Sequence, residues 1–259
     1  MRVDPVAAEG FSAAADLYER ARPSYPQEAI DWLVATTGIG PRSTVVDLGA
    51  GTGKLTRLLV PSGARVVAVE PIAEMRAHIV GAEVLDGTAE AIPLDDASAD
   101  IVAVAQAFHW FDQDKALPEI HRVLREEGSL VLVWNMRDLD DPLQRSVEDL
   151  LAPIRQDVPG QALGAWRDPL GQSALFGSAV VGTFEYEQQF TADDLCDRVA
   201  STSFVATMRP IDREELLVRV RALAAGLEEP FPFRYISEVH VIPRSSDGGP
   251  GEGGTSIKG

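Results

Sequence analysis

The sequence predicts an α/β fold built on a doubly wound, mostly parallel sheet, and three observations lead to that prediction. Short runs rich in β-branched residues alternate with helical stretches through the first half of the chain. Apolar residues follow one another within these runs, as is typical of strands buried on both faces of a helix-covered sheet. A turn with three glycines follows the first run. Open parallel sheets bind their ligands at such turns, outside the carboxyl ends of the strands.

Seven strands are expected in chain order, the last of them antiparallel: 44–48, 65–69, 82–85, 100–105, 129–134, 180–190 and 233–242. Helices over 53–59, 72–80 and 114–125 would connect the first five strands by right-handed crossovers. Asp112 has the side chain of a helix N-cap for the last of these helices, which Glu127-Gly128 would end.

The segments outside this core predict further elements of one domain over residues 1–243, whose cofactor-binding core spans 40–135. A helix within 11–26 precedes the core and stops before Pro23 and Pro26. The insertion 137–177, with a helix over 142–156, is too long for a plain connection, and we interpret it as a substrate cover. In the C-terminal part, 180–243, the pairs Thr191/Asp194 and Asp212/Glu215 resemble capping boxes that begin helices. Residues 244–259 are poor in apolar residues and are predicted to be disordered.

Composition argues against several classes of partner. The chain has 23 Lys and Arg against 40 Asp and Glu, a formal net charge of −17, without a cluster of five basic residues. We therefore expect neither a nucleic-acid nor a membrane partner. The only cysteine, Cys196, excludes a disulfide framework, and the histidines lack ligand-spaced partners, so no metal is predicted. With no signal-peptide pattern and no apolar run near the roughly 18 residues of a membrane helix, a cytoplasmic protein is expected; the oligomeric state stays open.

The strongest local motif is the turn Gly49-Ala-Gly51-Thr-Gly53 between the first strand and the next helix. Glycine tolerates positive φ and lets the backbone approach a ligand closely. Glu70 lies seventeen residues after Gly53, at the carboxyl end of the second strand. A carboxylate there can accept hydrogen bonds from both hydroxyls of a ribose, so the motif indicates a nucleoside-containing cofactor.

Other cofactors fit the turn less well. A P-loop requires Ser or Thr after Gly-Lys, but Leu55 follows Gly53-Lys54. The dinucleotide fingerprint G-x-G-x-x-G would place its third glycine at Lys54. G-x-G-x-G suits a shorter ligand with an amino-acid moiety. An NAD-linked oxidoreductase and a turn that serves packing alone are the weaker alternatives, and Lys54 and Arg57 are interpreted as solvated helix charges.

The motif Asp47-Leu-Gly-Ala-Gly-Thr-Gly53, with Glu70, resembles the class I S-adenosylmethionine-dependent methyltransferases. The segments Tyr18-Glu-Arg-Ala-Arg-Pro-Ser-Tyr-Pro26 and Ala105-Gln-Ala-Phe-His-Trp-Phe-Asp112 are similar to the trans-aconitate methyltransferase-like, type 11 subgroup. The resemblance implies a Rossmann-like, seven-stranded fold and S-adenosyl-L-methionine as cofactor.

The resemblance also implies site residues. The cofactor contacts would come from the N-terminal helix and the ends of the first four strands: Arg22, Asp47, Gly49, Ala50, Gly51, Glu70, Pro71, Thr88, Ala89, Glu90 and Gln106. Thr88 stands where many members carry an acid that receives the adenine amino group, and its hydroxyl can also accept a hydrogen bond. The acceptor would be bound by Tyr18, Tyr25, His109 and Trp110, with His109 as the catalytic residue.

Methyl transfer from a sulfonium is an in-line displacement, and alignment alone can supply roughly 7–11 kcal/mol of the barrier. A carboxylate is already ionised at pH 7, whereas a hydroxyl gains from a general base. His109 is the one plausible base and has no carboxylate fixed beside it in sequence, which favours an ionised oxygen or a stabilised carbanion as the nucleophile; O-methylation of a carboxylic acid is the main expectation. Arg22, Arg137 and Arg167 are candidates for the expected arginine clamp. A C-methyltransferase acting on a quinone or polyketide precursor and a non-catalytic cofactor-binding protein are the alternatives.

Overall fold

A computed structural model describes residues 15–155 and 167–246 and contains a seven-stranded sheet in the order β3-β2-β1-β4-β5-β7-β6. The strands are β1 (Thr44–Leu48), β2 (Arg65–Val69), β3 (Glu83–Leu85), β4 (Ala99–Ala105), β5 (Leu124–Arg137), β6 (Val180–Phe190) and β7 (Phe231–Pro243). β7 pairs antiparallel with both β5 and β6, and the other pairs are parallel. The predicted fold class is therefore confirmed, antiparallel last strand included.

Helices cover both faces of the sheet because each presents an apolar stripe to it. On one face, α3 (Gln27–Thr37) and α4 (Lys54–Leu59) bury Ile30, Leu33 and Leu59 against alternate residues of the central strands. On the other face, α6 (Gln113–Val123) and α8 (Arg167–Gln172) pack with the opposite alternate residues. Continuous burial along β1 follows from this double cover.

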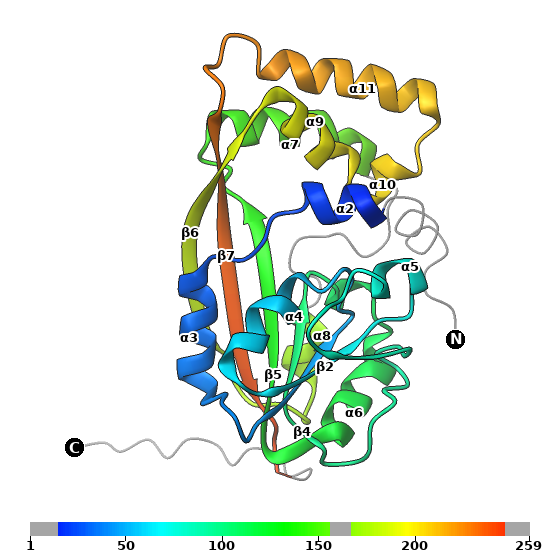
Figure 1. Ribbon diagram of the computed structural model, residues 1–259, viewed down its shortest axis with the longest axis vertical. Coiled ribbons are helices and arrows are strands. Elements are labelled where there is room, and N and C mark those ends of the chain that lie inside the picture. Colours follow the sequence, from blue (N-terminus) through cyan, green and yellow to red (C-terminus); the bar gives the residue numbers. More distant parts are fainter. Residues whose placement is uncertain (1–14, 156–166, 247–259) are drawn as a thin grey trace, which may run out of the picture.

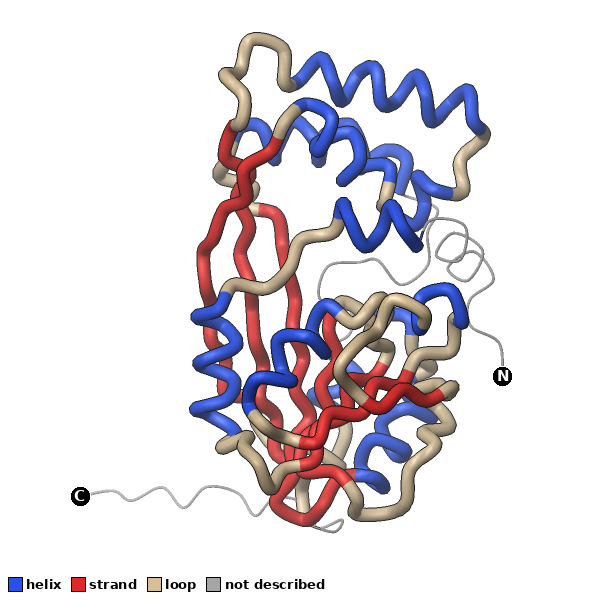
Figure 2. Tube along the Cα trace, in the orientation of Figure 1, coloured by secondary structure: helices blue, strands red, loops and turns tan. Residues whose placement is uncertain are grey.

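A second helical layer lies at the end of the sheet where β6 ends and β7 begins (Figure 1). It contains α7 (Pro142–Arg155), α9 (Ala192–Ala200), α10 (Ser203–Ala206) and α11 (Pro210–Leu223). These helices share a separate core with the aromatic residues of the two strands. Figure 2 shows α2 (Ala15–Ala21) between this layer and the part of the sheet that carries the glycine turn.

Ion pairs hold α2 to both layers. Glu19 accepts a hydrogen bond from the guanidinium of Arg57 on α4 at 2.5 Å. Arg20 donates to Asp197 on α9 at 2.9 Å. The predicted N-terminal helix is thus observed, although its residues before Ala15 lie outside the described part of the chain.

Several predicted boundaries differ from the structure. α5 (Ala73–Arg76) is one turn long and not the nine residues expected, and β5 already begins at Leu124, within the predicted helix. Asp112 is the N-cap of α6 but makes no side-chain capping bond, since its carboxylate pairs with Lys115.

The two predicted capping boxes have opposite outcomes. Thr191 and Asp194 form one at the start of α9. Asp212 and Glu215 do not, because α11 begins at Pro210 and the Asp212 carboxylate pairs with Arg209 instead. Proline at the first helical position has a backbone already suited to the helix, which moves the start forward.

The ends of the predicted domain map differ in part as well. The backbone N–H groups of Arg244 and Ser245 donate to Gly128 and Leu175, each at 2.9 Å, so the predicted disordered tail begins too early. Residues 247–259 lie outside the described chain. Within 137–177, α7 packs Val147 and Leu151 into the second layer, and residues 156–166 are not described. The cover function of this insertion, like the division into domains, stays a prediction.

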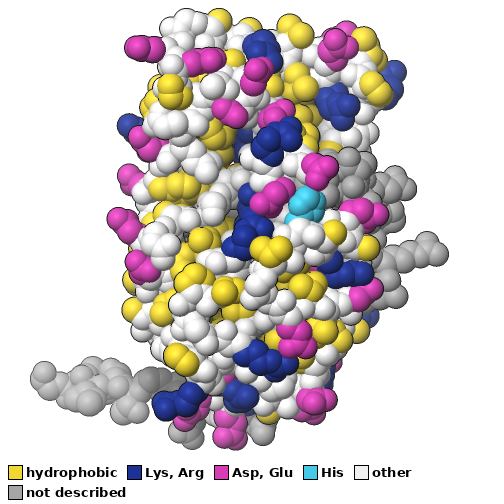
Figure 3. All heavy atoms as spheres, viewed as in Figure 1, with side chains coloured by type: hydrophobic (Ala, Val, Ile, Leu, Met, Phe, Trp, Pro, Cys, Tyr) yellow, Lys and Arg dark blue, Asp and Glu magenta, His cyan; other side chains and the backbone are white. Residues whose placement is uncertain are grey.

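Acidic and basic side chains are interspersed over the face shown in Figure 3, without a continuous basic area. Among the residues that the structure describes, none of the helices combines the length and apolar character needed to cross a membrane.

Candidate active site

The glycine turn forms one wall of a cavity because its backbone adopts left-handed conformations. φ is +69° at Gly49, +57° at Gly51 and +80° at Gly53. A Cβ on Gly49 would lie 2.9 Å from the Cβ of Ala107, so only glycine fits there. A Cβ on Gly51 would meet nothing within 4 Å, because this residue faces the open cavity.

Glu70 is fixed at the end of β2 by two backbone bonds. Gly51 N–H donates to Oε2 and Ile72 N–H donates to Oε1, both at 2.9 Å. The side chain is buried on the cavity wall, and this burial raises the pKa of the carboxyl group while the two N–H donors oppose the rise. Each oxygen keeps a lone pair for a further donor, as a ribose diol would supply.

Asp47 connects the end of β1 to α4, on the side of the glycine turn away from the cavity. Its side chain is fully buried at the end of β1, and Oδ2 accepts the hydroxyl of Thr56 on α4 at 2.5 Å. Burial raises the pKa of this carboxyl group to about 6. Asp47 does not line the cavity, so the structure places it as an anchor of the strand–turn–helix unit.

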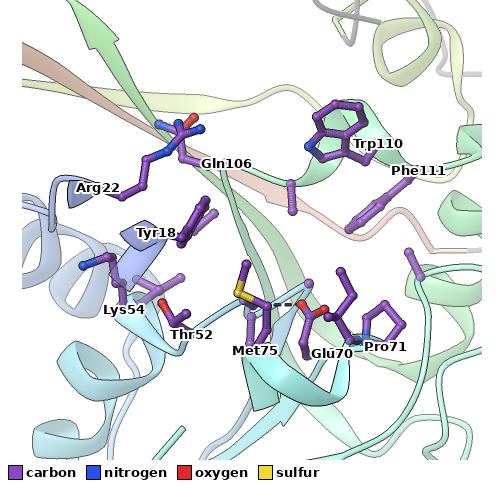
Figure 4. A pocket seen from close by; sticks show the side chains of 18 of the residues that line it. Tyr18, Arg22, Thr52, Lys54, Glu70, Pro71, Met75, Gln106, Trp110 and Phe111 are labelled. Carbon is purple, nitrogen blue, oxygen red and sulfur yellow. Dashed lines mark hydrogen bonds between the residues drawn. The ribbon is translucent and has the colours of Figure 1, made fainter. Parts of the chain in front are cut away.

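Figure 4 shows the side chains that line the cavity; the space among them, part of it open to solvent, is about 1280 Å³. Thirteen of the predicted site residues line it together: Tyr18, Arg22, Tyr25, Gly49, Ala50, Gly51, Glu70, Pro71, Thr88, Ala89, Glu90, Gln106 and Trp110. In Figure 4 the Arg22 and Gln106 side chains lie on the side of the cavity away from Glu70 and Pro71.

His109 lies beside the cavity rather than on its wall. It belongs to η2 (Phe108–Trp110), and its ring packs 4.7 Å from that of Trp110 and 5.6 Å from that of Trp134. Burial, with the nearby charge of Arg22, lowers the pKa of His109 to about 4. The imidazole is therefore neutral at physiological pH and a weak proton acceptor.

Positive charge gathers where α2 and α9 meet the cavity. Arg22 and Arg198 both line it, and neither pairs with a carboxylate among the described residues. Arg22 donates to the carbonyl of Ser201 at 2.9 Å, and Arg198 donates to the hydroxyl of Tyr235 at 3.1 Å. Burial and the neighbouring Arg198 charge lower the pKa of Arg22 to about 10.

Arg137, a predicted clamp residue, is instead engaged within the protein. It pairs with Glu148, which Arg155 also contacts. Burial and Arg198 lower the pKa of Arg137 to about 10 as well. The side chain of Arg167 lies outside the described part.

Sequence reasoning missed several residues of the wall. Arg198, Asn135 and Met75 line the cavity, and so does Lys54, which the sequence predicts to be a solvated helix charge; Phe111 lines it as a pocket wall, as its place beside Trp110 predicts. Lys54 donates to the carbonyl of Glu19 at 2.6 Å, and burial lowers the pKa of its amine. The available signal for Arg198 was its place three residues after Leu195, beside the apolar face of α9.

A glycine turn after β1, an acid at the end of β2 and a cavity over both define an α/β enzyme that binds a nucleoside-containing cofactor. Residues 46–132 match the methyltransferase domain family. A relative from Mycobacterium tuberculosis, named an uncharacterized methyltransferase, is 44% identical over 223 residues, which cover 83% of this chain and 85% of the relative. The chain belongs to the methyltransferase family and is a class I S-adenosylmethionine-dependent methyltransferase.

Two further comparisons are more distant. A malonyl-[acyl-carrier protein] O-methyltransferase from Methylococcus capsulatus is 36% identical over 132 residues, 46% of this chain and 48% of that protein. A solved structure from Anaeromyxobacter dehalogenans, assigned to the type II methyltransferases, covers 86% of this chain and 97% of its own with a TM-score of 0.66 at 24% identity. The latter likeness shows the fold.

Proposed function

We propose that the protein transfers the methyl group of S-adenosylmethionine to a carboxylate oxygen of a small acid. The cavity residues fit the cofactor. Gly51 leaves open space beside the turn, and Glu70 offers a buried carboxylate at the ribose. Thr88, Ala89 and Glu90 would border the adenine, with Pro71 nearby, and Arg22 and Gln106 would hold the methionine end.

The observation that carries the acidic acceptor is the excess of guanidinium groups. Arg22, Arg137 and Arg198 lie near one another, and of these three Arg137 pairs with a carboxylate, that of Glu148, which Arg155 also contacts. Buried charge without a partner is costly, so an anionic ligand is expected here. The methionine carboxylate would satisfy Arg22, which leaves Arg198 for a second carboxylate, that of the acceptor.

The cavity residues can promote this reaction by position. Bound S-adenosylmethionine supplies an electrophilic methyl carbon. An acceptor carboxylate is ionised at neutral pH, so no residue need remove a proton, in keeping with a weakly basic His109 behind the wall. Arg198 would orient the acceptor, and Tyr18, Tyr25 and Trp110 would exclude water around it.

Two likenesses support an O-methyltransferase that acts on an acid. The segments around Tyr18 and His109 resemble the trans-aconitate methyltransferase-like subgroup. A relative by sequence is named for O-methylation of malonyl-[acyl-carrier protein].

The test is methyl transfer to a panel of small acids by the wild type and three arginine variants. Arg198→Gln should raise the acceptor KM at least about tenfold, the loss expected for one buried charge contact, and leave cofactor affinity unchanged. Arg22→Gln should weaken the cofactor instead. Arg221→Gln, at an exposed residue paired with Asp193, is the control and should change neither.

Product analysis completes the test. A methyl ester releases methanol in base, whereas a carbon-bound methyl group does not. Alkali-stable product, or an unchanged acceptor KM in Arg198→Gln, would contradict the proposal.

A further inference from the structure

Two side-chain amides on the cavity wall donate their N–H groups to main-chain carbonyls. Gln106 Nε2 donates to the carbonyl of Asn135 at 2.9 Å, and Asn135 Nδ2 donates to the carbonyl of Ser24 at 2.9 Å. Both residues line the cavity. Because a carbonyl oxygen can only accept, these bonds fix the amide orientations and leave the two amide oxygens as acceptors.

Gln106 is held in place by its backbone. Its φ is +56°, in the left-handed region that residues other than glycine rarely adopt, and its N–H donates to Val133 at 3.0 Å. Such strain is found where a side chain must be aimed. It lies on the same side of the cavity as Arg22 (Figure 4), so this side offers one cationic donor and one amide acceptor, a match for the carboxylate and ammonium groups of the methionine end.

Asn135 and Arg198 offer a second acceptor and a second cation to the same cavity. Asn135 Oδ1 and Arg198 Nη1 are buried and have no hydrogen-bond partner in the described chain. Tyr186 links the two sites: its hydroxyl donates to Ser24 at 2.9 Å, beside the Asn135 amide, and its ring stacks 5.4 Å from that of Tyr235, which accepts from Arg198. An unsatisfied buried acceptor and a guanidinium without a carboxylate partner in the wall of one cavity call for a ligand that has both an anion and a hydrogen-bond donor.

The donor is better a hydroxyl than an ammonium group. Arg22 and Arg198 already place uncompensated positive charge at this end, and Arg137 lies close to Arg198. A further cation would be repelled, whereas a neutral O–H can donate to Asn135 at no charge cost.

We propose that the methyl acceptor is a hydroxy acid whose carboxylate binds Arg198 and whose hydroxyl group donates to Asn135 Oδ1. This inference rests on the proposed carboxylate methylation. Asn135 would therefore determine acceptor specificity, whereas Arg22 and Gln106 would bind the methionine end of the cofactor.

The experiment compares acids that differ in one group. Malate and lactate carry a hydroxyl group, aspartate and alanine carry an amine in its place, and succinate and propionate carry neither. A longer pair, 3-hydroxyoctanoate and octanoate, differs in the hydroxyl group alone. The wild type should methylate hydroxy acids with kcat/KM at least about tenfold above both partners, since a deoxy acid leaves Asn135 Oδ1 unsatisfied. Asn135→Ala should reduce that preference to within about threefold. Ser237→Ala is the control, because Ser237 is directly opposite Asn135 on β7, is fully buried and does not line the cavity.

Each outcome is decisive. Titration of both variants with S-adenosylhomocysteine shows that they are folded, and unchanged affinity is expected. Equal methylation of hydroxy and deoxy acids, preference for the amino acids, or a hydroxyl preference that survives Asn135→Ala would overturn the hydroxy-acid inference and leave carboxylate methylation standing. If no carboxylate of the panel is esterified, the proposed function fails and the inference with it.

Discussion

Replacing Gly51 by alanine separates the two roles of the glycine turn, backbone conformation and access for a ligand. Gly51 has φ +57° and open space where a Cβ would stand. Gly38 is its matched control: it caps α3 with φ +68°, has equally open surroundings and does not line the cavity. A left-handed conformation costs an alanine about 1–2 kcal/mol at either position.

Both variants should therefore melt lower than the wild type by similar amounts, about 2–8 °C at roughly 2–4 °C per kcal/mol. Calorimetric titration with S-adenosylhomocysteine should distinguish them. Gly51→Ala places its Cβ in the cofactor space and should weaken binding at least about tenfold, or 1.4 kcal/mol. Gly38→Ala should bind as the wild type does. If a folded Gly51→Ala variant binds within twofold of the wild type, the cofactor does not lie along this turn.

Two other predictions concern titratable groups. Burial raises the pKa of Asp47 to about 6 in the fold, so the folded state keeps a proton that the unfolded chain loses, and stability falls as pH rises through this interval. Denaturant melts should show the wild type losing about 2 kcal/mol between pH 4.5 and 7 relative to Asp47→Asn, and parallel pH curves would disprove the shifted carboxyl. His109→Gln should lower kcat less than tenfold in the same methyl-transfer assay, because an ionised acceptor needs no base; a loss of about 10²–10⁴-fold would show that His109 removes a proton from the acceptor.

The part of the site formed by the first two strands and the glycine turn could be predicted from the sequence. The glycine turn and Glu70 sit at the ends of consecutive parallel strands, so their chain positions imply their meeting. The strand pattern was equally readable, since burial on both faces requires unbroken apolar runs. The ends of the helices were harder to predict. The start of α11 depends on whether the Asp212 carboxylate caps the helix or pairs with Arg209, and the sequence pattern alone does not decide between the two.

The part of the cavity that carries Arg22 and Arg198 could not be predicted in the same way. Arg22 and Arg198 come together because α2 packs between the sheet and α9, and no local pattern states that distance. Asn135 was hidden for another reason. It lies near the end of the long strand β5, and the orientation of its amide, on which its proposed role rests, depends on a bond to Ser24, over a hundred residues earlier.

The division of the cavity has an evolutionary consequence. The segment shared with the methyltransferase domain family, residues 46–132, carries the turn, Glu70 and the adenine wall, while Arg22, Asn135 and Arg198 all lie outside it. Under the proposed function, the flanking segments can therefore change the methyl acceptor without altering the segment that carries the glycine turn. Under the proposed function, transplanting acceptor preference between homologues should require residues 15–22 and 192–201 together with the end of β5 that carries Asn135, because the Arg20–Asp197 pair and the Arg22–Ser201 bond tie the first two segments to each other.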